Sequence, residues 1–449
     1  MRDTLSTKNS TNGQNDRGNA WQNKKRFFLI IGVLSFLLWL LFLSTMCYLY
    51  GSIWKYTTRV NAFNILHIDY DHDAIGECLT QAYQQLRGHP FPTLLQVDSS
   101  KYPHPDDVVQ AVKENKFWGA FIVHSNSSNR LAAALHGGRD AQTYFSNPAL
   151  TYVWNEVRYP PISDEAIGTS LKTLVDATRL AYNSLFAPTA LQALNNTDPD
   201  ALQVLLNPIS SSSINLMPTN QGTKLFYNTV GMVMPILQQF FFLLILNGVC
   251  NEMKIYEQLP MKISLLLRTV LSVTFTLGAA LCTVGYIWAF REDWQVNGNQ
   301  FVLSWMTYWL LMYIHLLVLD SCTAFLPPPA LPFCVLTYII INITGTISPF
   351  EVNPGFYRWA YALPGREAYD VLTDIWSGGY VPHLHIALPV LFSWLVGAGA
   401  LAIFGHRFRY HRLVKEYEKE RMAEKDQTPN EPVDLDLHRR LSDDMRSEV

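Results

Sequence analysis

A run of alternating histidine and aspartate is the first place in the sequence where metal chemistry could occur. If the preceding strand continues through the run, alternation places four ligand-type side chains on one face: His67, Asp69, Asp71 and Asp73. Imidazole and carboxylate groups of this kind can bind a divalent cation. The alternative is a polar strand end and turn before Gly76, and we favour it because the glycine and glutamate positions do not match an EF-hand loop. We therefore predict no metal site.

Sequence motifs for other chemistry are absent. The chain has no GxxxxGK[ST] phosphate loop, no HExxH zinc motif, no GxSxG nucleophile turn and no CxxC pair. We therefore predict no catalytic residues and no cofactor. This favours a transporter, channel or scaffold over an enzyme, and a membrane-tethered ectoenzyme is the least favoured alternative.

The composition is typical of a polytopic membrane protein. Among 449 residues, 49% are hydrophobic and only 16% are charged, whereas a soluble chain carries roughly 25% charge. Several windows of 20 or more residues have no charge at all, while both ends of the chain have many. The net charge of -3 also excludes a basic nucleic-acid-binding surface.

Six apolar segments are long enough to cross a bilayer. The first, residues 27–50, is too long for a cleaved signal peptide, so we expect an uncleaved anchor. After a long polar stretch, further spans follow near residues 228–250, 266–290, 300–322, 330–348 and 386–405. These spans must be helices, because lipid satisfies no backbone polar groups.

The distribution of lysine and arginine predicts the orientation. Positive residues flank the first span on its N-terminal side, follow the second span and follow the last one. Both termini are therefore expected in the cytoplasm and residues 51–225 outside the cell. Two acceptor sequons in this outer segment, at Asn126 and Asn195, predict N-glycosylation there.

These predictions give a six-helix membrane protein with an extracellular α/β domain. The expected strands are residues 63–68 and 118–124, the expected helices are 106–114 and 167–185, and Ser210–Ser213 is expected to be a linker. In chain order, the predicted segments are a disordered cytoplasmic tail (1–26), the first transmembrane helix (27–50), the extracellular α/β domain (51–225), helices two to five (226–348), an outer interfacial or re-entrant element (349–385), the sixth helix (386–405) and a cytoplasmic tail (406–449).

Polar side chains within the spans are candidates for a transport pathway, because burying them in lipid is costly. They are Gln238, Gln239, Asn247, His315 and Asp320. The alternative for the three amides is hydrogen bonding between helices. Asp320 is expected at the membrane interface, where a charge costs little.

The segment 349–385 is too polar to span a membrane, and its tyrosines and tryptophans are typical of the headgroup region. It predicts two short helices broken at Pro364, which would form an outer gate. Upstream, Pro327–Pro329 cannot continue a helix and predicts a tight turn between spans four and five. The alternative for 349–385 is a covered loop without a role in transport. The candidate gate residues are Pro349, Phe350, Pro354, Gly355, Tyr357, Arg358, Pro364, Glu367 and Trp376.

The same segment carries a family resemblance. The run Ser348–Gly379 resembles the fungal nitrosoguanidine-resistance membrane proteins, and so do Asp69–Asp71, Phe117–Ala120 and Asn155–Arg158. The resemblance covers most of residues 27–410. That family is in turn similar to the membrane domains of type-2 ABC exporters, which have six spans and a short re-entrant helical element before the last one.

The resemblance implies a plasma-membrane protein that confers resistance to toxic small molecules by efflux. The partners it implies are membrane lipids, a small amphipathic molecule, a second copy in a homodimer and a separate ATPase, with no nucleic acid. The alternative is a membrane organiser that does not transport but acts in lipid or stress responses.

Overall fold

The computed structural model describes residues 4–88, 90–379 and 383–427, and the chain divides into two compact units, Met1–Ser52 and Ile53–Val449. The first unit contains one long helix, α1 (Thr4–Ser52), whose segment Phe28–Ser52 is long and apolar enough to cross a membrane. The helix therefore extends into residues 1–26, which the sequence predicted to be disordered. The physical reason is that an established helix adds further residues at little cost.

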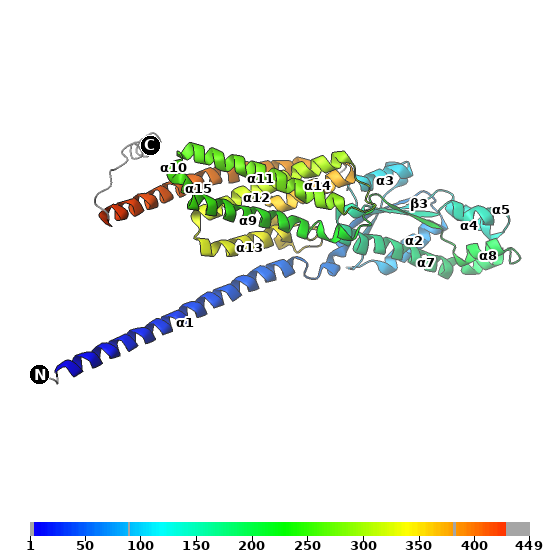
Figure 1. Ribbon diagram of the computed structural model, residues 1–449. Helices are drawn as coiled ribbons and strands as arrows, with labels where there is room; N and C mark the ends of the chain where they lie inside the picture. Colours follow the sequence, from blue (N-terminus) through cyan, green and yellow to red (C-terminus); the bar gives the residue numbers. More distant parts are fainter. Residues whose placement is uncertain (1–3, 89, 380–382, 428–449) are drawn as a thin grey trace. The chain divides into compact units, whose positions relative to one another are not determined.

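The second unit begins with a five-stranded sheet in the order β2-β1-β3-β4-β5 (Figure 1). All neighbouring strands are parallel except β3 and β4, which are antiparallel. The strands are β1 (Asn64–Asp69), β2 (Thr93–Gln96), β3 (Gly119–Val123), β4 (Leu150–Trp154) and β5 (Ser211–Asn215). The predicted Ser210–Ser213 linker is wrong, because these serines enter β5 and pair with β4, where Ser212 and Thr151 are joined by a 2.7 Å hydrogen bond.

Helices cover both faces of the sheet. Leu66 and Ile122 point to one face and pack against α3, whereas Ile65 and Phe121 point to the other and pack with residues of α2, α4 and α7. This alternation makes the domain an α/β fold, as the sequence predicted. Its helices are α2 (Ala74–Leu86), α3 (Pro105–Lys113), α4 (Ser127–Leu135), α5 (Arg139–Thr143), α6 (Pro160–Ile162), α7 (Thr169–Ala193) and α8 (Pro199–Leu206).

The second half of the unit is a bundle of long helices that lie side by side (Figure 1). The helix α12 is central and contacts α9, α11, α13 and α15. The bundle comprises α9 (Val230–Glu252), the short α10 (Ile255–Gln258), α11 (Met261–Ala289), α12 (Gly298–Phe325), α13 (Leu331–Thr344) and α15 (Leu384–Gln427).

Five helices of the described chain are long and apolar enough to span a membrane: the one in the first unit and α9, α11, α12 and α15. The fifth predicted span, 330–348, corresponds to α13, which has 14 residues. At 1.5 Å per residue it rises about 21 Å, less than a hydrocarbon core of roughly 30 Å. It is short because the proline turn at 327–329 delays its start, and it ends at Gly345.

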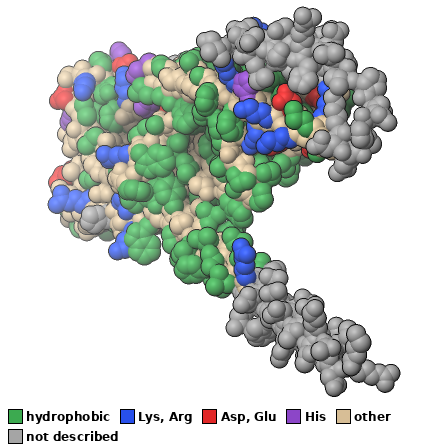
Figure 2. Space-filling model, turned by 90° about the vertical axis from the view of Figure 1, so that its left-hand side faces the viewer, with side chains coloured by type: hydrophobic (Ala, Val, Ile, Leu, Met, Phe, Trp, Pro, Cys, Tyr) green, Lys and Arg blue, Asp and Glu red, His purple; other side chains and the backbone are tan. Residues whose placement is uncertain are grey.

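The outer faces of these helices are apolar. Large side chains such as Ile245, Leu266 and Phe404 are exposed on α9, α11 and α15, and Figure 2 shows broad hydrophobic areas on the surface it presents. A soluble protein rarely exposes so much contiguous apolar surface. The protein is therefore a polytopic helical membrane protein.

Candidate functional site

Residues 349–379, the part of the segment before the undescribed residues 380–382, contain the two short helices that the sequence predicted, η8 (Gly355–Ala362) and α14 (Pro364–Ser377), with the break at Pro364. Proline suits the first turn of α14 because its missing N–H has no intrahelical partner there. The helix ends at Gly378, which adopts a φ of 84° that glycine tolerates. All residues of α14 are buried, although the helix carries one arginine, one glutamate and two aspartates.

The nine candidate gate residues divide by exposure. Six are buried, Pro354 is half-buried, and Gly355 and Arg358 are exposed. The buried ones are Pro349, Phe350, Tyr357, Pro364, Glu367 and Trp376. Buried members make the contacts that hold this element in place.

The first half of α14 is attached to the α/β domain. Arg366 donates a 2.8 Å hydrogen bond from Nη1 to the Tyr159 hydroxyl and forms an ion pair with Asp370 one turn later. The rings of Tyr159 and Tyr369 also meet edge to face, with centroids 5.2 Å apart. The α/β domain and α14 therefore share a buried polar and aromatic contact.

The second half of α14 is attached to α12. Trp376 donates from Nε1 to the Ser304 hydroxyl at 3.1 Å, and Gln300 donates to the carbonyl of Ile375 at 2.8 Å. The Trp376 ring also packs on Trp294 at 5.5 Å. A displacement of α14 would therefore disturb contacts both with the α/β domain and with α12, the central helix of the bundle.

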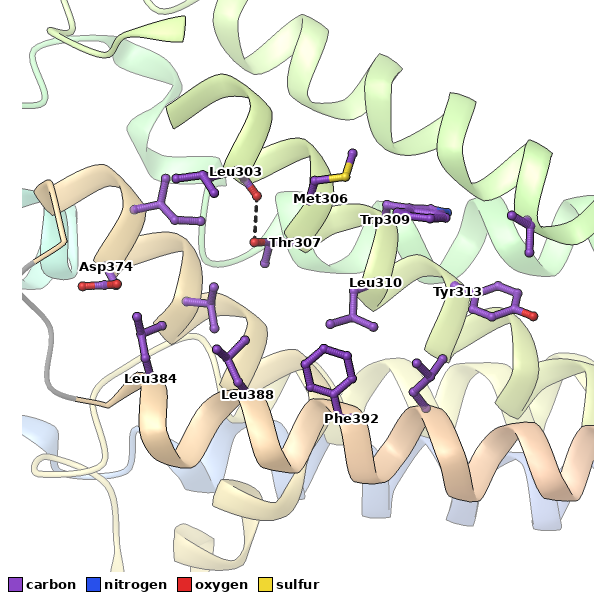
Figure 3. Close-up of a pocket in the computed structure, with 14 residues that line it drawn as sticks. Leu303, Met306, Thr307, Trp309, Leu310, Tyr313, Asp374, Leu384, Leu388 and Phe392 are labelled. Carbon is purple, nitrogen blue, oxygen red and sulfur yellow. Dashed lines mark hydrogen bonds between the residues drawn. The ribbon is translucent and has the colours of Figure 1, made fainter. Parts of the chain in front are cut away.

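A cavity of about 710 Å³ lies beside this helix, between α11, α12, α14 and α15. Figure 3 shows its walls, with Asp374 at one end and Leu310, Tyr313 and Phe392 further along the bundle. The Thr307 hydroxyl on the wall donates to the carbonyl of Leu303 at 2.9 Å. Nearly all other lining side chains are aliphatic or aromatic: Val273, Leu303, Met306, Trp309, Leu310, Tyr313, Val371, Ile375, Leu384, Leu388, Phe392 and Leu395.

This arrangement suits an amphipathic occupant. A cavity of this size is in the range of small-molecule sites, which are mostly apolar with a few polar groups that fix orientation. The apolar walls would bury a hydrocarbon part, and the end near Asp374 would receive a polar head.

A second cavity of about 570 Å³ lies between the start of α9 and the end of α11. Gln238 lines it together with Tyr227, Tyr286 and Phe290. Of the five candidate pathway residues, Gln238 is the one that lines either cavity.

Two further pathway residues lie within helix contacts. Gln239 is 0% exposed, and its side-chain amide has no hydrogen-bond partner in the part of the chain that the structure describes. His315 on α12 is equally buried, and its Nδ1 is hydrogen-bonded to the Tyr338 hydroxyl of α13 at 2.8 Å. His315 therefore makes a hydrogen bond between helices, a contact that the sequence offered as the alternative for the three amides and not for this histidine.

The remaining two, Asn247 and Asp320, belong to a buried charge cluster. Asp320 accepts hydrogen bonds from Arg268 of α11, at 2.9 and 2.5 Å, and from Arg409 of α15, at 2.8 Å. Asn247 of α9 accepts from Arg268 at 2.8 Å. Asp320 is 6% exposed and its charge is compensated by two arginines, while its place at the membrane interface stays a prediction.

Sequence reasoning missed Arg268 and Arg409. The signal for Arg268 was present, because it is a charge inside a predicted span and such charges are paired by default. Arg409 was read only as part of the positive flank of the last helix. It was also missed that Arg366 and Asp370 form a pair, although their spacing of four residues is that of helical ion pairs.

The His67–Asp73 run forms a strand end and turn, the alternative that the sequence favoured. Asp69 accepts from the backbone N–H of Asp71 at 2.9 Å, Asp71 accepts from the N–H of Ser128 at 3.1 Å, and Asp73 caps α2. Within the described ranges, no group of three or more potential ligands could hold a metal ion.

The Asn155–Arg158 turn carries another buried carboxylate. Glu156 accepts from Lys224 at 2.7 Å, from Asn215 at 2.6 Å and from Thr219 at 2.5 Å. Burial raises the pKa of Glu156, but these donors lower it by more, so that it lies below its ordinary value. The turn thereby joins β5 to the segment that leads into α9.

Both sequon asparagines are exposed at turns. Asn126 precedes α4, and Asn195 accepts from the Thr197 hydroxyl of its own sequon at 2.7 Å. Their modification stays a prediction.

Comparison with known proteins identifies a family. A family described as protein of unknown function (DUF3533) matches residues 34–399. An uncharacterized endoplasmic reticulum membrane protein of Saccharomyces cerevisiae is 23% identical over 278 residues, which cover 59% of this chain and 54% of the relative. The match thus spans about half the length of that relative. No solved structure matches. The chain belongs to the DUF3533 family.

Proposed function

We propose that this member of the DUF3533 family is an exporter of small amphipathic molecules that confers resistance to toxic compounds at the plasma membrane. The observation that supports this most is the apolar cavity of about 710 Å³ between α11, α12, α14 and α15. It is formed by three helices with the length and composition of membrane spans and by the enclosed helix α14. An amphiphile could enter such a cavity from the bilayer.

The proposal has a definite topology. Both termini are cytoplasmic, and the α/β domain is extracellular. The sixth membrane helix is α13 together with the turn Pro328–Ala330 that precedes it, which extends the apolar helical segment to Pro328–Thr344. The contacts of α14 with Tyr159 and Ser304 support its role as the outer gate, because they connect the α/β domain with the bundle. The protein is not an enzyme. Its proposed partners are membrane lipids, a second copy of the chain and a separate ATPase.

The test fills the cavity. Leu388→Trp on α15 adds bulk to the cavity wall, and Val396→Trp, on the same helix but at a side chain that is 72% exposed, is the matched control. The measurements are binding of the fluorescent amphiphile rhodamine 6G to purified protein and its accumulation in cells. We expect Leu388→Trp to weaken binding about tenfold and to raise accumulation, whereas Val396→Trp leaves both unchanged. Unchanged binding and accumulation in Leu388→Trp would contradict the proposal.

A second function is favoured by a different observation. His315, Asn247 and Asp320 make interhelical contacts and line neither of the two cavities described above, as expected of a membrane organiser that binds lipid without transport. The endoplasmic reticulum location in the relative's name agrees with an organelle-based role. In that case Gln238→Ala and Gln239→Ala would leave resistance intact, and cells without the gene would accumulate normal amounts of rhodamine 6G.

A further inference from the structure

Glu367 is a buried carboxyl group in the first turn of α14. Its side chain is among the least accessible of the ionisable groups, at 2% exposed, and its Oε1 atom has no hydrogen-bond partner among the residues described. A buried carboxylate without a partner is costly, so such a group takes up a proton instead.

Its neighbours on α14 do not compensate a negative charge. The adjacent Arg366 already pairs with Asp370 and donates to Tyr159. Asp370 carries a like charge close to Glu367. Burial, assisted by Asp370 and opposed by Arg366, raises the pKa of Glu367 to about 7.

The elements packed against α14 carry charged groups that have partners elsewhere or are exposed. On η4, Glu156 pairs with Lys224 and Arg158 lies 3.7 Å from Glu351. On η8, Arg358 is exposed. These groups therefore do not compensate a negative charge on Glu367, and the charges nearest to it are those of Arg366 and Asp370 on its own helix.

The bundle helices offer no closer compensation. On α12, His315 is bonded to Tyr338 of α13, and Asp320 pairs with Arg268. Tyr308 of α12 is neutral and fully buried, and α15 begins next to His383 and His385. Among the residues that the structure describes, the charged groups that act most on Glu367 are Asp370 and Arg366.

The helix that carries this carboxyl also forms a wall of the amphiphile cavity. Val371, Asp374 and Ile375, one to two turns after Glu367, line it. Because α14 is one rigid helix, a change that moves its first turn also moves this wall. A charge on Glu367 disfavours the enclosed position of α14, and a proton on it favours that position.

We propose that Glu367 is a proton-binding site that couples the position of α14 to a proton gradient across the membrane. With α14 enclosed, the carboxylate holds one proton, taken up from the water on the outer side as an O–H bond; when α14 moves, the carboxyl opens to the inner side and releases that proton there. The inference rests on the proposed export function and supplies it with an energy source within this chain.

The first experiment detects the proton without any substrate. Infrared spectra of the purified full-length protein are recorded from pH 5 to pH 9, and the carboxylic C=O stretching band is followed. We expect a wild-type band that disappears as the pH rises through about 7 and is missing from Glu367→Gln. Glu292→Gln, at an exposed glutamate in the loop before α12, should retain it. A band that is identical in Glu367→Gln would overturn the proposal.

The second experiment measures coupling. Rhodamine 6G flux is followed in proteoliposomes with and without an imposed pH gradient. We expect the gradient to change wild-type flux about tenfold and to leave the Glu367→Gln flux unchanged, because glutamine mimics the permanently protonated form. Wild-type dye binding without any effect of the gradient on flux refutes the coupling and leaves export standing. A titrating band without dye binding refutes export and leaves the proton-binding site standing.

Discussion

Two separate groups of paired charges are buried in the described helical part. One is Asp320 with Arg268 and Arg409, where α11, α12 and α15 meet. The other is Arg366 with Asp370 on α14. Removing charges from water costs several kcal/mol per ion, and only close partners offset that cost. These pairs therefore add little net stability. Removing one partner, however, leaves a buried charge without a counter-charge and destabilises the fold.

The first prediction follows from the excess of arginine around Asp320. In Asp320→Asn, both guanidinium groups lose their counter-charge inside the bundle, and we expect a loss of about 3–5 kcal/mol in stability. The measurement is the melting temperature of purified protein in detergent. Asp293→Asn, at an exposed aspartate in the loop between α11 and α12, should melt like the wild type. Equal melting of Asp320→Asn and wild type would mean that the arginines have other partners.

The second prediction concerns pH and His67. Burial lowers the pKa of His67 from 6.5 to about 4, in spite of the nearby Asp69. His67 therefore takes up a proton at a higher pH in the unfolded chain than in the folded chain. Above pH 6.5 the neutral histidine makes its full contribution to the free energy of unfolding. As the pH drops to 4, that contribution falls by up to about 3 kcal/mol.

The variant that tests this is His67→Leu, which cannot be protonated. We expect its melting temperature to fall less between pH 7 and pH 4 than that of the wild type. The control is His136→Leu, at an exposed histidine of the same domain, and it should not alter the slope. Parallel pH profiles for His67→Leu and wild type would show that His67 has access to a proton in the folded state.

At the scale of elements, local chemistry was predictable and long-range pairing was not. Proline fixed the break at Pro364 and the turn at Pro327–Pro329, because it cannot continue a helix whatever its surroundings. In contrast, Ser211–Asn215 has the composition of a linker and becomes a strand only because β4 offers it a free edge. The partners of Asp320 come from helices 52 and 89 residues away, which no local pattern reveals.

The third prediction tests the turn between α12 and α13. The Sγ atoms of Cys322 and Cys334 lie 3.6 Å apart, and both cysteines are free thiols. We expect mild oxidation with copper phenanthroline to join them, with the loss of two hydrogen atoms detected by mass spectrometry of the linked peptides. In Cys334→Ser the link should not form, and the exposed Cys282 should remain free in both proteins. If Cys322 stays free in the oxidised wild type, the two helices do not pack as described.

In the second unit as a whole, α14 connects two parts whose surfaces suit different solvents, the α/β domain and the helix bundle. The α/β domain has the polar surface loops and alternating strands of a domain in water, whereas the bundle exposes hydrocarbon side chains. Aromatic rings continue from Trp118 and Tyr159 of the first through Tyr369 of α14 to Trp376 and Trp294 at the bundle. This packed series of rings connects the cavity with the α/β domain, so that a molecule bound in the cavity can affect the packing of that domain.

The last prediction concerns which side of the membrane that domain occupies. If residues 51–225 are extracellular, they pass through the secretory lumen, where exposed sequons receive glycans. Asn126 and Asn195 are both exposed, so we expect Asn126→Gln and Asn195→Gln each to lower the apparent mass on a gel and the double variant to match enzymatically deglycosylated protein. A cytosolic domain would give neither shift, and in that case a cysteine placed at Asn126 would react with an impermeant maleimide only after the cells are permeabilised. The same cysteine reacting in intact cells would place the domain, and with it the α14 contacts of Tyr159, on the outer side of the plasma membrane.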